Sequence, residues 1–132
     1  MRVLFDTSAY SALLAGHADV GEVAHTAEEI YVNPIVLGEL QAGFLHGSRR
    51  RKNLDLLAQF LSSPRVAVLD VTAATTDRYA LIVDALRRVG TPIPTNDVWI
   101  AATAMEHGLR VVTMDPHFLS VQGVLVECFA SG

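Results

Sequence analysis

Residues 2–8, Arg-Val-Leu-Phe-Asp-Thr-Ser, are the stretch of the sequence that decides the fold. Their first part, Arg2 to Phe5, is a short and mostly apolar run, which predicts a strand buried inside a sheet. The next three residues, Asp6-Thr7-Ser8, all favour the first positions of a helix. A buried strand that passes directly into a helix predicts an α/β domain.

The rest of the chain repeats this alternation of short apolar strands and helices. After a first helix that ends near residue 15, we predict helices over residues 19–26, 34–46, 48–61, 72–89 and 96–107. We predict strands over residues 2–5, 30–32, 66–69, 110–113 and 124–127. This alternation is typical of a mainly parallel sheet covered by helices. Because the sequence shows no repeat, low-complexity tract or linker, we predict one domain over residues 1–132.

The composition excludes several other classes of protein. Hydrophobic residues make up 51% of the 132 positions, so the chain can bury a core and is not expected to be disordered. No apolar run approaches the roughly 18 residues that span a bilayer, and we expect no membrane association. A charge stands as early as Asp6, too soon for a signal peptide, so we expect the cytoplasm. The one cysteine, Cys128, cannot form an internal disulfide and is expected in the core.

Four acidic residues are predicted to meet at one edge of the sheet. Asp6 and Asp115 each follow a predicted strand and therefore lie at the carboxyl ends of the strands. Asp97 lies in the first turn of one predicted helix and Glu39 lies one turn into another, and both helices begin at the same edge. In such sheets, ligands bind beyond the carboxyl ends of the strands, so these residues mark the candidate site.

Each acid also has a purely structural interpretation. Asp6 could serve only as a helix N-cap, and Asp97 could serve only to complement a helix dipole. Asp115, which precedes Pro116, could be a turn residue. Glu39 would ordinarily be solvated, but its helical neighbours are apolar and no basic residue follows four positions later.

Taken together, the four acids favour a bound divalent cation. Carboxylates gathered within a few ångströms raise one another's pKa, and a cation that binds oxygen relieves the repulsion. Few protein ligands combined with water and substrate phosphate is the pattern that Mg²⁺ prefers. Zinc is not indicated, because the five histidines show no chelating spacing and the cysteine stands alone.

Four segments of the chain carry a resemblance to a known family. They are residues 4–8 (Leu-Phe-Asp-Thr-Ser), 38–40 (Gly-Glu-Leu), 95–104 (Thr-Asn-Asp-Val-Trp-Ile-Ala-Ala-Thr-Ala) and 111–118 (Val-Val-Thr-Met-Asp-Pro-His-Phe). In order and spacing they resemble the PIN-domain family, and most closely the VapC-type toxins of bacterial toxin–antitoxin pairs. The Asp-Thr-Ser opening is weak by itself, whereas the Asn-Asp helix followed by Thr-x-Asp-x-x-Phe is specific.

The resemblance implies a fold, an activity and a set of site residues. PIN domains are metal-dependent ribonucleases, built as a three-layer α/β/α sandwich around a mainly parallel sheet. The implied catalytic residues are Asp6, Glu39, Asp97 and Asp115. Of these, Asp6, Asp97 and Asp115 would bind the metal, whereas Glu39 would bind a second metal or orient the attacking water. The implied supporting residues are Thr7, Asn96 and Thr113.

The same resemblance implies the cofactor and the partners. The cofactor would be Mg²⁺, for which Mn²⁺ is expected to substitute, and it would activate the water that cleaves RNA. A small VapB-like antitoxin would wrap the toxin and block the acidic pocket with its C-terminal segment, and a homodimer is expected. The net charge of −4 is unusual for a protein that binds RNA. The basic run, Arg49, Arg50, Arg51 and Lys52, is either a solvated face or a phosphate contact along the RNA path.

Two alternatives remain open from the sequence. A phosphohydrolase of the haloacid-dehalogenase type also places Asp after its first strand, but it needs a second acid where this chain has Ser8. Its catalytic lysine is also without a counterpart, because the only lysine is Lys52 in the basic run. The other alternative is a PIN fold that is catalytically inactive and serves as a binding module. A ribonuclease assay with added Mg²⁺ or Mn²⁺ separates it from an enzyme.

Overall fold

Strand β1 (Arg2–Phe5) lies in the middle of the sheet in the computed structural model, which describes residues 1–130. Within these residues the sheet has five strands in the order β3-β2-β1-β4-β5, and every neighbouring pair is parallel. The other strands are β2 (Glu29–Val32), β3 (Val66–Val68), β4 (Arg110–Thr113) and β5 (Val126–Cys128). The apolar residues 3–5 of β1 are fully buried, as expected for a central strand covered on both faces.

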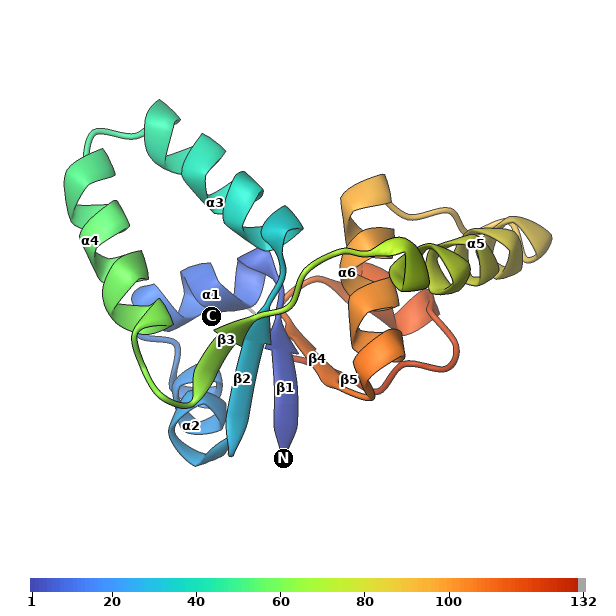
Figure 1. Cartoon of the computed structure of the whole chain (residues 1–132), viewed down its shortest axis with the longest axis horizontal. Helices are drawn as coiled ribbons and strands as arrows, with labels where there is room; N and C mark the ends of the chain where they lie inside the picture. The colour runs from blue at the N-terminus through green and yellow to red at the C-terminus, as the bar shows by residue number, and fades with distance from the viewer. Residues whose placement is uncertain (131–132) are drawn as a thin grey trace.

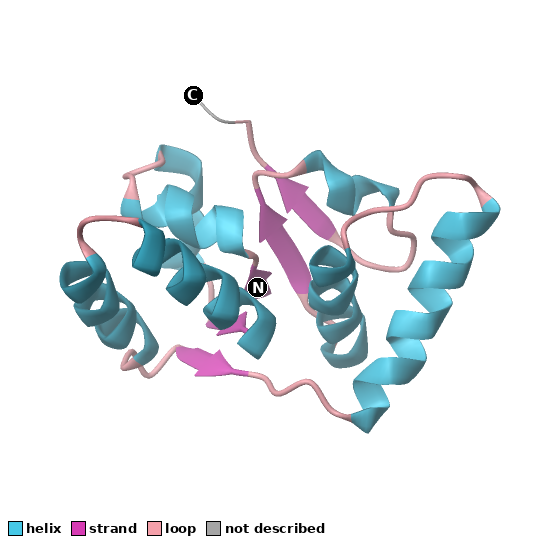
Figure 2. Ribbon diagram, turned by 90° about the horizontal axis from the view of Figure 1, so that it is seen from above, coloured by secondary structure: helices cyan, strands magenta, loops and turns pink. Residues whose placement is uncertain are grey.

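Helices cover both faces of this sheet. They are α1 (Thr7–Leu14), α2 (Ala18–Thr26), α3 (Pro34–His46), α4 (Arg50–Leu61), α5 (Ala73–Arg88) and α6 (Thr95–His107). Helices α1 to α4 lie on one side, and α5 and α6 lie on the other (Figures 1 and 2). The predicted three-layer α/β/α sandwich is therefore confirmed. Within residues 1–130, no helix is long and apolar enough to cross a membrane. The predicted domain runs to residue 132, and its last two positions lie outside the described residues.

The element boundaries differ from the predicted ones where local backbone geometry intervenes. Helix α4 begins at Arg50 and not at residue 48, because residues 47 and 48 form a bend and Arg49 caps the helix without a side-chain hydrogen bond. Strand β5 begins at Val126 and not at residue 124, because a turn with Gly123 at φ +84° precedes it. The remaining helix and strand ends agree with the prediction to within about one residue.

Two further features were not predicted correctly. A short 3₁₀ helix, η1 (Pro116–Ser120), follows β4, and the Asp115 side chain caps it by accepting a hydrogen bond from the His117 backbone N–H. Cys128 was expected in the core, but it is only partly buried because β5 is an edge strand of the sheet.

The strand order reverses next to β1. The chain first moves outward from β1 through β2 to β3, and then returns over α5 and α6 to place β4 on the opposite side of β1. The carboxyl ends of β1 and β4 are therefore neighbours from which the connections leave in different directions. This reversal of strand order is where open α/β sheets bind their ligands.

A buried polar contact joins the two helical layers near this reversal of strand order. Asn33 precedes α3 and is fully buried, and its Oδ1 accepts a hydrogen bond from the Val36 backbone N–H, which caps the helix. Its Nδ2 donates to Thr103 Oγ1 on α6 at 3.0 Å. The contact fixes the start of α3 relative to α6.

Candidate metal centre

The structure brings the four predicted acids together at the carboxyl edge of the sheet. Asp6 follows β1 and Asp115 follows β4, while Glu39 extends from α3 and Asp97 from the first turn of α6. The pKa of Asp97 is raised, chiefly because the side chain is buried and then because Asp115, Asp6 and Glu39 lie nearby. We call Asp6, Glu39, Asp97 and Asp115 the acidic site.

Asp6 is the most deeply buried member of the acidic site, with 3% of its surface exposed. Its Oδ1 accepts a hydrogen bond from the Ala9 backbone N–H at 2.8 Å, so it caps α1 as well as facing the site. Its Oδ2 accepts from the Thr113 hydroxyl at 2.6 Å. Burial raises the pKa of Asp6, and the hydrogen bonds from Thr113, Ala9 and Ser8 partly offset this rise.

Two hydroxyl groups tie Asp6 to the loop after β4. Thr113 is fully buried, and its Oγ1 accepts a hydrogen bond from the Asp115 backbone N–H while it donates to Asp6. Ser8 donates to both carboxylate oxygens of Asp6, at 2.8 and 3.0 Å, and accepts from the Met114 backbone N–H at 2.9 Å. Thr113 was predicted as a supporting residue, whereas Ser8 was missed.

The two remaining supporting residues, Thr7 and Asn96, hold the Glu39 side chain. The Thr7 hydroxyl donates to Glu39 Oε1 at 2.6 Å, and Asn96 Nδ2 donates to Glu39 Oε2 at 3.2 Å. A carboxylate beside apolar neighbours needs compensating contacts, and these two hydrogen bonds supply part of them. They join α1, α3 and α6 beside the acidic site.

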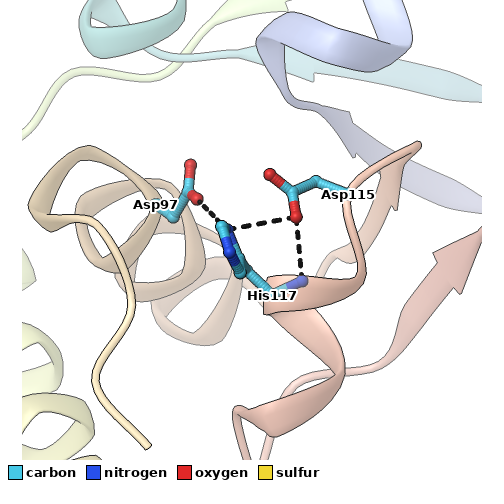
Figure 3. Close-up of side chains that lie close together, drawn as sticks. All are labelled: Asp97, Asp115 and His117. Atoms are coloured by element: carbon cyan, nitrogen blue, oxygen red, sulfur yellow. Dashed lines mark hydrogen bonds and ion pairs between the residues drawn. The ribbon is translucent and has the colours of Figure 1, made fainter.

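Asp97, Asp115 and His117 form the outer part of the site (Figure 3). His117 Nδ1 lies 3.4 Å from Asp97 Oδ2 and 3.1 Å from Asp115 Oδ1. One ligand atom from each of the three residues lies within 4.8 Å of the other two. The Asp97 side chain is only 16% exposed, whereas that of His117 is 50% exposed.

His117 was not predicted as a site residue, although it stands in one of the quoted segments. The histidines were considered only as a chelating set, and a single histidine two positions after an aspartate gives no such spacing. Pro116 starts η1 and turns the chain, so that the imidazole reaches back over Asp115. The Asp115-Pro116 pair indicated a turn at this point, but not that the turn would bring His117 to the acids.

The donor set fits a divalent cation. Carboxylate oxygens are the ligands that hard cations such as Mg²⁺ and Mn²⁺ prefer. Within residues 1–130, no arginine or lysine forms an ion pair with Asp6, Glu39, Asp97 or Asp115. Among the described residues, only the His117 imidazole is therefore available to balance the negative charge of the acidic site. A bound cation would balance it as well.

The basic run lies at the turn between α3 and α4, beyond the far end of α3 from the site (Figure 1). Its four side chains are exposed, and none of them forms an ion pair within the described part of the chain. Arg50, Arg51 and Lys52 occupy the first turn of α4, where cations oppose the helix dipole. The structure therefore offers no intramolecular reason for this concentration of charge.

Comparison with known proteins identifies the family. The family model for the PIN domain matches residues 3–124. Ribonuclease VapC4 of Mycobacterium tuberculosis is 33% identical over 125 residues, which cover 95% of this chain and 95% of that protein. The crystal structure of VapBC2 from Rickettsia felis, bound to a DNA fragment from their promoter, matches with a TM-score of 0.83 and 25% identity over 98% of this chain and 99% of that one.

A second solved structure agrees with this assignment. VapBC-5 of Mycobacterium tuberculosis, described as a member of the VapBC family of toxin–antitoxin systems, matches with a TM-score of 0.72 and 25% identity. The alignment covers 98% of both chains. The fold, the acidic residues at the switch point and the match along most of the chain together show that this protein belongs to the PIN-domain family, and within it to the VapC type.

Proposed function

We propose that this protein is a Mg²⁺-dependent endoribonuclease that acts as the toxin of a toxin–antitoxin pair. The observation that carries the proposal is the acidic site itself: four carboxylates from separate elements meet without an arginine or lysine partner in the described part of the chain. Such a cluster is unfavourable unless a cation binds it. The naming of Ribonuclease VapC4, a relative at 33% identity, supports RNA as the substrate.

In this mechanism the protein supplies cation ligands and positions the reacting groups. Asp6, Asp97 and Asp115 would hold the cation, and Thr113 would keep the Asp6 carboxylate turned toward it. A bound Mg²⁺ would lower the pKa of a water molecule and stabilise charge on the phosphodiester. Mn²⁺ would substitute because it accepts the same oxygen ligands.

Glu39 would orient the attacking water. Each of its carboxylate oxygens accepts one hydrogen bond, from Thr7 and from Asn96, and each retains a second acceptor position. The carboxylate is thus fixed in direction while still able to accept a proton from water. Asn96 is exposed beside Glu39 and would also contact the RNA.

The phosphohydrolase alternative fits the geometry poorly. That chemistry uses the first aspartate as a nucleophile beside a catalytic lysine, but the only lysine of the chain, Lys52, lies in the first turn of α4. The position of the required second acid holds Ser8, which is itself bonded to Asp6. The inactive binding module differs from the proposal only in its activity, and an assay distinguishes them.

The test is RNA cleavage by the purified chain with Mg²⁺, and by three comparison samples. Asp97→Asn and a sample in EDTA should lose cleavage by a factor of at least about 10³, because both remove cation binding. Asp55→Asn, which makes the same charge change at an exposed site on α4, should retain the wild-type rate. Cleavage that persists in EDTA would overturn the metal mechanism, and absence of cleavage with Mg²⁺ and with Mn²⁺ would favour the binding module.

We propose in addition that the basic run contacts RNA phosphates. From Glu39 to the end of α3 at His46 is seven residues, or about 10 Å along a helix, so one RNA strand could reach both regions. In an inactive Asp97→Asn background, replacing Arg50 and Arg51 by Gln should weaken RNA binding and reduce the salt dependence by about 0.7 in log–log slope per lost phosphate contact.

The matched control for the basic run is on α5. Replacing Arg87 and Arg88 by Gln removes the same charge at the opposite helical layer and should leave RNA binding nearly unchanged. Equal loss of binding in the two double variants would show only a general charge effect. No loss in the α4 variant would leave the basic run as a solvated face.

The proposed partners are a VapB-like antitoxin and a second copy of the chain. The solved VapBC2 and VapBC-5 structures support the antitoxin. Co-expression with a VapB-like antitoxin should yield a complex in which RNA cleavage is inhibited. Light scattering of the free chain should give twice its mass of 14.3 kDa if the homodimer forms.

A further inference from the structure

The proposed mechanism assigns no role to His117, although its ring lies beside Asp97 and Asp115. It reaches the site from η1, on the solvent side, and its Nδ1 approaches carboxylate oxygens of two different elements. We infer that His117 is a nitrogen ligand of the catalytic cation, and that it makes this centre bind Mn²⁺ more tightly than Mg²⁺. The inference rests on the proposed metal-dependent function and specifies the ligand set of the same site.

The distances agree with three ligands of one cation. Adjacent ligand atoms of an octahedral site with bonds of about 2.1 Å lie about 3.0 Å apart. His117 Nδ1 lies 3.1 Å from Asp115 Oδ1 and 3.4 Å from Asp97 Oδ2, and all three atoms fall within 4.8 Å. The two carboxylates are turned toward the imidazole and not away from it (Figure 3).

The surrounding structure fixes His117 in this position. Asp115 accepts a hydrogen bond from the His117 backbone N–H at 2.9 Å, so the same carboxylate that would bind the cation also orients the residue beside it. Phe118 follows directly and is fully buried, which anchors η1 to the core. The backbone of His117 is thus held on both sides, while its half-exposed ring can adjust around a cation.

The nitrogen atom is what would distinguish between cations. Mg²⁺ prefers oxygen ligands and exchanges its water reluctantly, whereas first-row transition cations gain affinity from imidazole. Asp97 and Asp115 offer oxygen to either cation, so only His117 can favour Mn²⁺. A centre that used the carboxylates alone would show much less preference.

A different role for the same geometry makes the opposite prediction. A charged imidazole between Asp97 and Asp115 would act as a counter-ion in the cation's place, and it would have to leave before a metal could bind. Removal of a ligand weakens metal binding, whereas removal of a competing cation strengthens it. The sign of the change in Mn²⁺ affinity therefore decides between the two roles.

The experiment measures metal binding directly, without RNA. Mn²⁺ and Mg²⁺ titrations are followed by calorimetry on the full chain, and bound Mn²⁺ is examined by pulsed electron paramagnetic resonance for coupling to a nitrogen nucleus. The wild type should show nitrogen coupling. His117→Ala should lose it, and its Kd for Mn²⁺ should rise by about tenfold or more while that for Mg²⁺ changes little. His25→Ala, at an exposed position on α2, should behave as the wild type.

Each outcome supports or overturns the inference. Mn²⁺ binding without nitrogen coupling, or unchanged or tighter Mn²⁺ binding by His117→Ala, would overturn it while leaving the metal centre intact. Loss of all Mn²⁺ binding in Asp97→Asn identifies the acidic site as the place of binding. If the wild type binds neither cation, the proposed metal-dependent function fails together with the inference. Circular dichroism of each variant confirms that it is folded.

Discussion

At the scale of single residues, the acidic site depends on hydroxyl groups as much as on carboxylates. Burial raises the pKa of Asp6, and donors from Thr113, Ser8 and the Ala9 backbone favour its charged form. Without them, a carboxylate that is 3% exposed would be poorly placed to remain charged and to bind a cation. Ser8 also holds the loop that carries Asp115, because its hydroxyl oxygen accepts a hydrogen bond from the Met114 backbone N–H.

Replacing Ser8 by Ala should therefore destabilise the protein and weaken its site. The change removes the bond to Asp6 and leaves the Met114 N–H without its partner, at a cost of about 1–2 kcal/mol. Thermal unfolding should show Tm lowered by roughly 3–8 °C. Ser11→Ala makes the same change at an exposed position of α1 and corrects for helix propensity. Equal Tm values for the two variants would contradict the role assigned to Ser8.

At the scale of helices and strands, the sequence indicated which elements exist and where the acids would lie. The strand-end rule is local, so Asp6 and Asp115 could be assigned to one edge from apolar runs alone. The hydrogen-bond partners of the acids were harder to predict. Ser8 lies 106 positions from Met114 and 105 positions from Thr113 along the chain. Their contact depends on the exact pairing of β1 with β4, which no local pattern specifies.

The same limit applies to η1 and to the α3–α6 contact. The Asp115-Pro116 pair indicated a turn, but not that a 3₁₀ helix would return His117 to the acids. Asn33 was recognised only as the start of a helix, since its second partner, Thr103, lies on a distant element. Tertiary contacts of this kind complete the site, and they are the part that the sequence did not predict.

Asn33 offers a test at this scale, because it joins the two helices that carry Glu39 and Asp97. Asn33→Ala removes a helix cap and a buried hydrogen bond and should destabilise the fold by about 2 kcal/mol. In a double-mutant cycle with Thr103→Val, measured by urea denaturation, the coupling between the two positions should be about 1 kcal/mol. Additive effects of the two substitutions would mean that the hydrogen bond between Asn33 and Thr103 contributes nothing to stability.

At the scale of the whole molecule, all three layers of the sandwich contribute residues to the acidic site. Asp6 and Asp115 come from the ends of sheet strands, Glu39 from the α1–α4 side and Asp97 from the α5–α6 side. Burial is the main cause of the raised pKa of Asp97, and repulsion from Asp115, Asp6 and Glu39, which lie in other layers, adds to it. Packing between the layers must therefore offset the repulsion among the carboxylates. A bound cation would replace this repulsion by attraction.

Mg²⁺ or Mn²⁺ should consequently stabilise the entire domain, because the native state binds the cation and the unfolded chain does not. At a concentration of 100 times Kd the gain is about 2.7 kcal/mol. Without metal, Asp97→Asn should be more stable than the wild type, since it removes a buried like charge, and with metal the order should reverse. Thermal unfolding in EDTA and in each cation measures both effects, and Asp55→Asn should follow the wild type throughout.

Amide hydrogen exchange should locate the effect of the cation in the structure. Added cation should slow exchange in η1 and in the first turns of α1 and α6, and it should leave exchange in α4 unchanged. Because α4 carries none of the acids, slowing of exchange there to the same degree would show that the cation acts through general charge screening and not by joining the layers at the site.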